Sequence, residues 1–238
     1  MTRVFIVTPT YNERGNLEEL IKRTAEAVPD FKMIVIDDNS PDGTGELAKK
    51  LAQTYPIKVL CRKEKAGLGT AYAYAFKKIL AGEFDDWGQP GLIVQMDADL
   101  SHDPLVIPRM IKETQNHDLV LGSRYIPGGQ IVNWNTARRL LSRFGNIYAR
   151  AVLGLPYRDL TGGFKCFKRH VLENIDLDSL SSVGYNFQIE TTHKAHLAGH
   201  KINEIPITFT ERKEGKSKIN LPIILESFWR VLLLRFQK

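Results

Sequence analysis

The sequence has little cysteine and no long apolar run, and each absence excludes a class of protein. Two cysteines, Cys61 and Cys166, occur in 238 residues, and neither stands in a Cys-x-x-Cys pair. A disulfide framework is therefore excluded, and a reducing compartment is expected. No stretch of about 18 uncharged apolar residues exists, so we expect no segment to span a membrane unaided. The first apolar run is also too short for a signal peptide, and the composition is that of an ordinary globular protein.

Glycine is missing where a dinucleotide-binding fold requires it. Residues 8–14, which follow the first apolar run, contain none. The Gly67-Leu68-Gly69 segment does not continue to a third glycine at the spacing that admits a pyrophosphate. Hydride transfer on a dinucleotide cofactor is therefore not expected. His193 and His196 share a predicted helix, but no further ligand cluster accompanies them, so zinc is not expected there.

Basic charge is concentrated in two segments. The whole chain has a net charge of +6, yet residues 124–170 contain nine basic side chains and one acidic side chain. Residues 212–238 contain seven basic and two acidic side chains. A solvated surface is one interpretation, and an anionic partner such as phosphate, nucleic acid or a membrane face is the other. Acidic motifs elsewhere would repel a nucleic acid, so we expect no nucleic-acid partner.

Apolar runs and helical patterns alternate along the first half of the chain. Strands are predicted at 3–8, 33–38, 57–61, 92–97 and 118–123, and helices at 16–27, 44–54, 69–80 and 104–114. This alternation predicts an α/β fold with a mostly parallel sheet flanked by helices, which binds ligands beyond the carboxyl ends of its strands. Further along, helices are predicted at 137–152, 186–198 and 221–236, a glycine-bent loop at 157–167 and a strand at 201–209.

Two acidic motifs follow predicted strands. Asp97-Ala98-Asp99 places two carboxylates on one side of an extended chain, which suits Mg²⁺ or Mn²⁺ shared with a diphosphate. An Asx-type turn without a metal is the alternative. Asp37 and Asp38 end the second strand, where a carboxylate accepts hydrogen bonds from a ribose or base.

These motifs belong to an ordered series that resembles a known family. The segments 9–13 (PTYNE), 37–44 (DDNSPDGT), 67–69 (GLG) and 97–99 (DAD) resemble the inverting family 2 glycosyltransferases of the GT-A (Rossmann-like) fold. The segments 122–125 (GSRY), 159–165 (DLTGGFK), 187–190 (FQIE) and Arg212 with 215–218 (GKSK) narrow the resemblance to the dolichyl-phosphate (polyprenyl-phosphate) mannosyltransferases. The resemblance covers nearly the whole chain.

The resemblance implies which residues bind the donor nucleotide and which hold the divalent cation. The donor nucleotide would be bound by Pro9, Tyr11, Glu13, Asp37, Asp38 and Ala98. The divalent cation, Mg²⁺ or Mn²⁺, would be held by Asp97, Asp99 and Ser101. Family members often have glutamine at the position of Ser101, whose shorter hydroxyl would act through water.

The basic residues would bind the phosphates of both substrates. In the family, the acceptor phosphate is bound at the positions that correspond to Arg124, Arg138 and Ser142. The loop that closes over the donor diphosphate has its basic residues at the positions of Arg212 and Lys218. Asp99, Arg124 and Arg212 would act directly in catalysis. The residues that would contact the sugar or orient other side chains of the site are Asp159, Gln188 and Glu190. Asp159 is the single acid of its basic segment and is expected to orient an arginine, whereas Glu190 is alternatively a helix cap.

The resemblance also implies substrates and location. The donor would be GDP-mannose, the acceptor a polyprenyl or dolichyl phosphate, and the product β-linked. UDP-glucose or UDP-N-acetylglucosamine is the alternative donor. Residues 1–220 would form the glycosyltransferase domain, and residues 221–238 an amphipathic helix lying on the cytoplasmic face of a membrane. Packing of that helix on the sheet is the alternative, and a separate membrane subunit is a further expected partner.

Overall fold

Seven strands form the central sheet of the protein, and the computed structural model describes residues 2–180, 184, 186–211 and 221–236. The order across the sheet is β3-β2-β1-β4-β7-β5-β8. The strands are β1 (Val4–Thr10), β2 (Lys32–Asp37), β3 (Ile57–Cys61), β4 (Leu92–Gln95), β5 (Leu119–Ser123), β7 (Lys165–Lys168) and β8 (Ile202–Pro206). Only β7 runs antiparallel to its neighbours, β4 and β5, among the strands of this sheet. The predicted α/β class with a mostly parallel sheet is confirmed.

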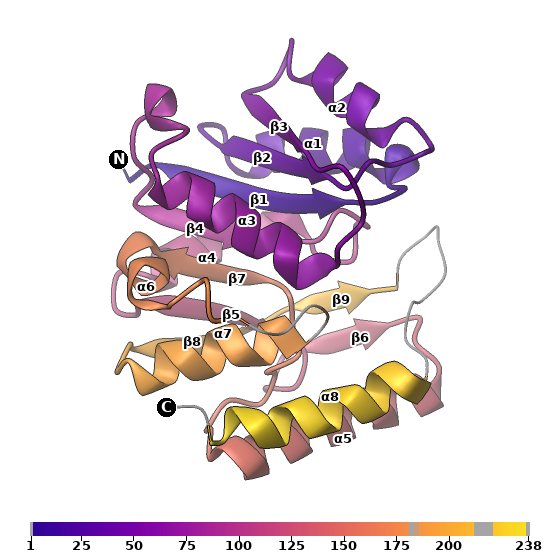
Figure 1. The fold of residues 1–238 in the computed structure, drawn as a ribbon, viewed down its shortest axis with the longest axis vertical. Helices are drawn as coiled ribbons and strands as arrows, with labels where there is room; N and C mark the ends of the chain where they lie inside the picture. The colour runs from indigo at the N-terminus through magenta and orange to yellow at the C-terminus, as the bar shows by residue number, and fades with distance from the viewer. Residues whose placement is uncertain (1, 181–183, 185, 212–220, 237–238) are drawn as a thin grey trace.

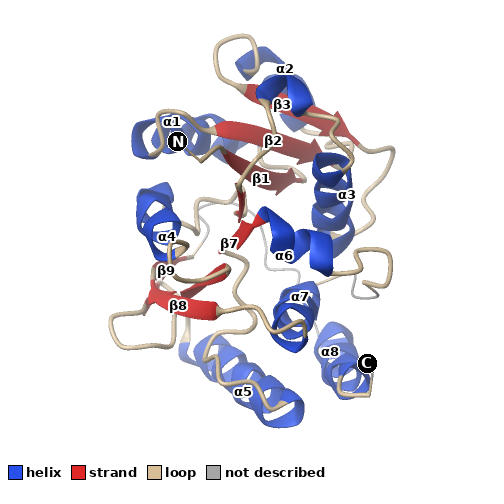
Figure 2. Ribbon diagram, turned by 90° about the vertical axis from the view of Figure 1, so that its left-hand side faces the viewer, coloured by secondary structure: helices blue, strands red, loops and turns tan. Residues whose placement is uncertain are grey.

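Helices cover both faces of the sheet (Figures 1 and 2). One face is covered by α1 (Arg14–Ala27), α2 (Thr44–Leu51), the 3-10 turn η2 (Pro104–Val106) and α4 (Ile107–Glu113). The other is covered by α3 (Leu68–Leu80), the 3-10 turn η1 (Asp85–Trp87), α6 (Arg169–Asn174) and α7 (Asn186–Leu197). Each face buries its own apolar cluster, so the central strands are apolar on both sides.

Helices α5 (Thr136–Leu153) and α8 (Leu221–Leu234) lie side by side beyond the β8 edge of the sheet (Figures 1 and 2). The Phe228 ring packs against Phe144 and Tyr148, and the Tyr148 hydroxyl donates a hydrogen bond to the Phe228 carbonyl at 3.0 Å. Val231 and Leu234 of α8 are buried in the core. Among the described residues, no helix has the length and apolar content needed to cross a bilayer.

Two sequence predictions about the second half are wrong. The segment 201–209 is not one strand, because the chain leaves the large sheet after Pro206 and pairs as β9 (Thr208–Thr210) with β6 (Gln130–Val132) in a small parallel sheet. The segment 157–167 is not loop throughout, because its last residues enter β7. Lysines begin and end β7 and interrupt the apolar run by which a buried strand is recognised.

The carboxyl ends of β1, β2, β4 and β5 meet at one edge of the sheet. Three of the loops that follow contain a non-glycine residue in the left-handed region, namely Asn12 (φ 60°), Asn39 (φ 55°) and Leu100 (φ 60°). Asparagine adopts this conformation readily, but leucine is strained there. Leu100 directly follows the Asp97-Ala98-Asp99 motif, so backbone strain is located beside the candidate site.

Candidate active site

Asp97 and Asp99 lie just beyond the end of β4, where the first acidic motif was predicted to act. Asp99 is buried, and its Oδ1 accepts hydrogen bonds from the Ser101 backbone N–H at 3.1 Å and the Ser101 hydroxyl at 2.5 Å. A cavity of about 150 Å³ adjoins them and is lined by Asp99, Ser101, Asp103 and Glu211, among others. Two carboxylates and a hydroxyl are hard oxygen donors, so this group fits Mg²⁺ or Mn²⁺. Ser101 orients Asp99, and its predicted role in the metal site, acting through water, stays a prediction.

Tyr72 of α3 supports the other carboxylate of the pair. Its hydroxyl donates a 2.9 Å hydrogen bond to Asp97 Oδ1. Burial, reinforced by the negative charge of Asp97, raises the pKa of Tyr72 well above its usual value, so the hydroxyl keeps its proton. Tyr72 therefore does more than pack in the core. No local pattern marked it, because 25 residues separate it from Asp97.

Gly163 brings the second half of the chain against Asp97. A Cβ at Gly163 would lie 3.2 Å from Asp97 Oδ2 and 3.5 Å from Gln188 Nε2, so a side chain there would press on the carboxylate. Gly163 belongs to a turn that begins at Asp159 and leads directly into β7. The antiparallel strand thus places this turn between the Asp97 motif and the arginines described below.

His102 holds the turn that carries the motif. Its Nδ1 accepts a hydrogen bond from the Asp97 backbone N–H at 3.2 Å, and its ring stacks on Phe164 with centroids 4.9 Å apart. Burial lowers the pKa of His102, despite the opposing charges of Asp97 and Asp99. The neutral ring is the form that accepts this hydrogen bond, so His102 holds the turn without carrying a charge.

The second acidic motif is organised by an arginine that the sequence did not reveal. Arg62 forms a bidentate ion pair with Asp38, with both N–O distances 2.6 Å. Asp37 accepts hydrogen bonds from the Ser40 backbone at 3.0 Å, the Ser40 hydroxyl at 2.6 Å and the Thr10 hydroxyl at 3.0 Å. The two carboxylates therefore fix the loops after β1 and β2 at the edge where a nucleotide was expected.

The residues after β1 lie beside this loop. The Glu13 carboxylate accepts a hydrogen bond from Asn16 at 2.9 Å, and its backbone N–H donates to the Thr44 hydroxyl at 3.0 Å. The Lys65 ammonium lies 4.2 Å from the centre of the Tyr11 ring. Pro9 is half-buried near the end of β1, and Ala98 is buried within the metal motif. The structure thus gathers the predicted nucleotide residues at one edge, and their roles stay predictions.

Arg124 follows β5 and pairs with Asp159, which was expected to orient an arginine. Two side-chain hydrogen bonds of 2.7 Å join them, and both residues are buried. Burial opposes the charge of Arg124, but the attraction of Asp159 outweighs it and raises the pKa of Arg124. The guanidinium also lies within 5.5 Å of the ring centres of Tyr125, Trp134 and Phe209. It is therefore a fixed positive charge at the carboxyl edge of the sheet.

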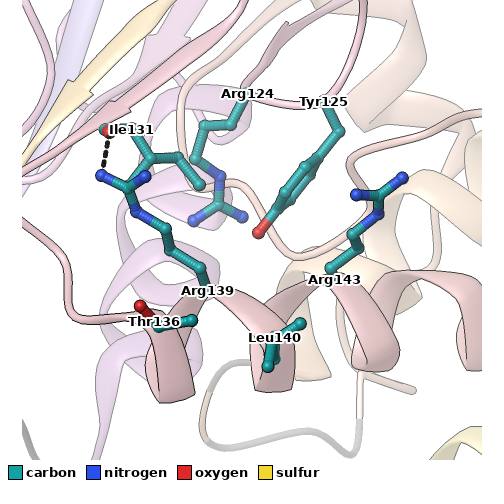
Figure 3. Close-up of a pocket in the computed structure, with 7 residues that line it drawn as sticks. All are labelled: Arg124, Tyr125, Ile131, Thr136, Arg139, Leu140 and Arg143. Atoms are coloured by element: carbon teal, nitrogen blue, oxygen red, sulfur yellow. Dashed lines mark hydrogen bonds between the residues drawn. The ribbon is translucent and has the colours of Figure 1, made fainter.

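A cavity of about 340 Å³ opens between this arginine and α5 (Figure 3). Its lining consists of Arg124, Tyr125, Ile131, Thr136, Arg139, Leu140 and Arg143. Three positive charges thus surround a cavity with apolar walls. Arg139 donates a hydrogen bond to the Ile131 carbonyl at 2.8 Å, which fixes its guanidinium beside the cavity (Figure 3).

Arg138 and Ser142, which were also predicted to bind the acceptor phosphate, do not line this cavity. Arg138 forms a 2.6 Å ion pair with Glu211 and stacks on Trp134 at 4.1 Å, outside the cavity lining. Ser142 is half-buried on the next turn of α5, also outside that lining. Arg139 and Arg143, both exposed on α5, line the cavity. Helical spacing places residues 136, 140 and 143 on one face and could have indicated this.

The predicted sugar-contacting residues are buried behind the motif. Gln188 accepts a 2.6 Å hydrogen bond from Gln95, and Glu190 is fully buried. Lys165 is buried with them and donates to the carbonyl of Gln188 at 2.5 Å and to the Thr191 hydroxyl at 3.0 Å. Burial lowers the pKa of Lys165 to about 7. Arg212 and Lys218 lie outside the described residues, so their predicted role in closing over the diphosphates stays a prediction.

Residues 5–176 match the family model of glycosyl transferase family 2. The chain therefore belongs to glycosyl transferase family 2, and the protein is a glycosyltransferase. An undecaprenyl-phosphate mannosyltransferase of Micrococcus luteus is 42% identical over 226 residues, which are 94% of this chain and 90% of that protein. A polyprenol monophosphomannose synthase of Mycolicibacterium smegmatis is 43% identical over 235 residues, 96% of this chain and 85% of that protein. The family resemblance read from the motifs is confirmed.

Solved structures agree on the fold. A glucosyl-3-phosphoglycerate synthase of Mycobacterium tuberculosis, crystallised with Mn²⁺, uridine diphosphate and its product, superposes with a TM-score of 0.66. The match covers 98% of this chain and 78% of that chain at 18% sequence identity. A structure of the same enzyme with phosphoglyceric acid gives a TM-score of 0.66 at 17% identity. The predicted GT-A fold is confirmed.

Proposed function

We propose that this protein transfers mannose from GDP-mannose to the phosphate of a polyprenyl or dolichyl phosphate, with inversion at the anomeric carbon. The observation that supports this best is the position of the arginine-lined cavity at the same sheet edge as Asp97 and Asp99. Both curated relatives have this acceptor class in their names. The choice of GDP rests on the family resemblance of the motifs.

The acceptor chemistry requires positioning more than activation. A phosphate monoester has a second pKa near 6, so most of it is dianionic at neutral pH. One of its oxygens can attack the anomeric carbon as the bond from that carbon to the nucleoside diphosphate breaks. No proton has to leave the acceptor, so no general base is needed, and a single displacement inverts the configuration. The site has to hold the two substrates in line and balance their charges.

The residues of this chain supply both requirements. Asp97 and Asp99 would hold the divalent cation, which when bound stabilises the negative charge of the departing diphosphate. Arg124, fixed by Asp159, would bind the acceptor phosphate together with Arg139 and Arg143, which line the same cavity, because a planar guanidinium can engage two phosphate oxygens at once. Arg138 and Ser142 would contribute from the adjacent turn of α5. Arg212 and Lys218 would close over the diphosphates.

A donor panel tests this proposal. Purified protein is supplied with a short-chain polyprenyl phosphate and, in turn, with GDP-mannose, UDP-glucose and UDP-N-acetylglucosamine, with and without EDTA. We expect transfer from GDP-mannose, loss of transfer in EDTA and recovery on adding Mg²⁺ or Mn²⁺. The product should have a β-linked mannosyl phosphate by nuclear magnetic resonance. Transfer from a UDP-sugar alone would contradict the donor, and an α-linked product would contradict inversion.

We further propose that α5 and α8 together rest on a membrane, at its cytoplasmic face. Large apolar side chains are exposed along both helices, namely Leu140, Phe144 and Ile147 on α5 and Trp229, Leu233 and Phe236 on or just after α8. Leu140 also lines the arginine cavity, so the apolar surface adjoins the proposed acceptor site. Such a surface lets a lipid phosphate reach the site while its chain stays in the bilayer. The division into residues 1–220 and 221–238 and a separate membrane subunit stay predictions.

Glutamate at either of two exposed positions should weaken membrane binding. Phe144→Glu and Trp229→Glu each remove a side chain that is more than half exposed, so neither should alter stability much. Burying such a side chain in lipid contributes about 1.5–3 kcal/mol, so each variant should bind anionic liposomes roughly 10- to 100-fold more weakly. Sedimentation with vesicles measures this.

Leu105→Glu is the matched control, since Leu105 is 65% exposed on η2, away from α5 and α8. Removing α8 entirely would be a poorer test, because Val231 and Leu234 would leave the core. Equal loss of binding in all three variants, or no loss in any of them, would contradict the proposed surface.

A further inference from the structure

Three metal-ligating side chains meet at the edge of the sheet opposite the candidate active site. Asp118 directly precedes β5, His170 lies in the first turn of α6, and His200 lies between α7 and β8. Each offers one ligand atom, and these atoms lie within 4.8 Å of one another. His170 Nε2 is 3.4 Å from Asp118 Oδ1, and the two imidazole centroids are 5.3 Å apart.

We propose that Asp118, His170 and His200 bind a divalent transition-metal ion of the zinc type, with water as a fourth ligand. A tetrahedral zinc ion with ligands at about 2.0–2.1 Å separates its ligand atoms by roughly 3.3 Å, close to the observed His170–Asp118 distance. Two imidazole nitrogens and a carboxylate favour Zn²⁺ over Mg²⁺, which prefers oxygen ligands. The His170 side chain is 48% exposed, so an ion can enter from solvent.

Neighbouring groups already orient two of the ligands. The Lys201 backbone N–H donates a 3.0 Å hydrogen bond to Asp118 Oδ2, which fixes the carboxylate plane. Asn174 Nδ2 lies 3.4 Å from His200 Nε2. If the amide is turned so that its oxygen faces this nitrogen, it would accept the N–H of an imidazole that ligates through Nδ1. Partners of this kind set the direction of metal ligands and contribute to affinity.

Lys168 competes for the same carboxylate. Its ammonium lies 3.1 Å from Asp118 Oδ1, the oxygen nearest to His170. Binding of an ion therefore requires Lys168 to turn away, and its side chain, 31% exposed, has solvent to enter. This competition distinguishes a metal site from a purely structural cluster. Only at a metal site does removal of the Lys168 charge increase the affinity for Zn²⁺.

The ion would connect elements that are far apart in the sequence. The ligands lie on or beside three elements: Asp118 precedes β5, His170 is in α6 and His200 precedes β8. Both strands belong to the half of the sheet beyond β4. An ion that binds only the folded state stabilises it by mass action. Zn²⁺ should therefore raise the unfolding temperature of the whole protein without any donor or acceptor present.

Calorimetric titration of the full-length chain without a histidine tag tests the proposal, using Zn²⁺ in the presence of millimolar Mg²⁺. We expect one Zn²⁺ per chain, bound more than tenfold more weakly by His170→Ala and by His200→Ala. Lys168→Met should tighten binding by roughly two- to fivefold. Asp99→Asn is the control and should leave this Zn²⁺ site unchanged.

Thermal unfolding of the same proteins provides the second readout. In EDTA the histidine variants should unfold at the wild-type temperature, and added Zn²⁺ should raise only that of proteins with both histidines. The proposal is overturned if the histidine variants bind Zn²⁺ like the wild type. It is equally overturned if Lys168→Met leaves Zn²⁺ affinity unchanged, or if Zn²⁺ does not stabilise the wild type.

Discussion

Asp99→Asn should lower the rate of sugar transfer by about a thousandfold or more while leaving the fold intact. Asparagine has nearly the same shape and can still accept the hydrogen bonds that the backbone and hydroxyl of Ser101 give to Asp99. What it lacks is the negative charge by which the carboxylate would hold a divalent cation on the donor diphosphate. Transfer measured at saturating donor and saturating Mg²⁺ reports the effect, and circular dichroism reports the fold.

Asp103→Asn is the matched control for that variant. Asp103 lines the same cavity as Asp99, but its carboxylate accepts a hydrogen bond from the Leu105 backbone at 3.1 Å and pairs with Arg23 at 2.9 Å. We expect this variant to keep transfer within a few-fold of the wild type. A wild-type rate for Asp99→Asn would contradict the assignment of the cation to this motif.

Loss of either partner of the Arg124–Asp159 pair should lower the free energy of unfolding by about 3–5 kcal/mol. Both side chains are buried, so removing one leaves the other as an uncompensated charge inside the protein. Arg124→Ala and Asp159→Ala should both show this loss in urea unfolding. They should also reduce transfer, because Arg124 lines the cavity proposed for the acceptor phosphate.

A double variant separates the two effects. Replacing the pair with apolar residues of similar size, Arg124→Met with Asp159→Leu, should recover part of the lost stability, because no unpaired charge remains. The Arg124 backbone N–H, which donates to Asp159 at 2.9 Å, still loses its acceptor, so recovery should be incomplete. Transfer should not recover, since no guanidinium is left to bind the phosphate. Losses below 1 kcal/mol in the single variants would contradict the burial argument, and transfer by the double variant would contradict the role of Arg124.

The sequence predicted those parts of the fold and site whose signals are local. The runs that form β1, β2, β3, β4 and β5 are apolar and continuous, and helical patterns separate them, so their place in a parallel sheet followed. The Asp97 and Asp37 motifs follow strands directly, so the sheet edge that they share could be derived from strand direction alone. That Asp159 pairs with an arginine followed from charge, since Asp159 is the single acid of its segment, but the structure was needed to identify that arginine as Arg124.

Other parts depend on contacts that no local pattern records. Arg62 pairs with Asp38 across 24 residues, and Tyr72 meets Asp97 only because α3 packs over β1, which pairs with β4. Strand β7 was missed because Lys165, which is buried, resembles a surface residue in the sequence. Its ammonium is accommodated by a carbonyl and two threonine hydroxyls of α7, which lie 23 to 27 residues further along the chain.

The reversed strand β7 also determines when β4 and β5 can be joined into one sheet during synthesis. Strand β5 is made before either of its neighbours, because β7 begins only at Lys165 and β8 only at Ile202. Until β7 emerges from the ribosome, β4 and β5 each present an unpaired edge, which other chains can join. Because the turn from Asp159 to Gly163 immediately precedes β7, the closing of these edges and the assembly of the active-site edge are one event in folding.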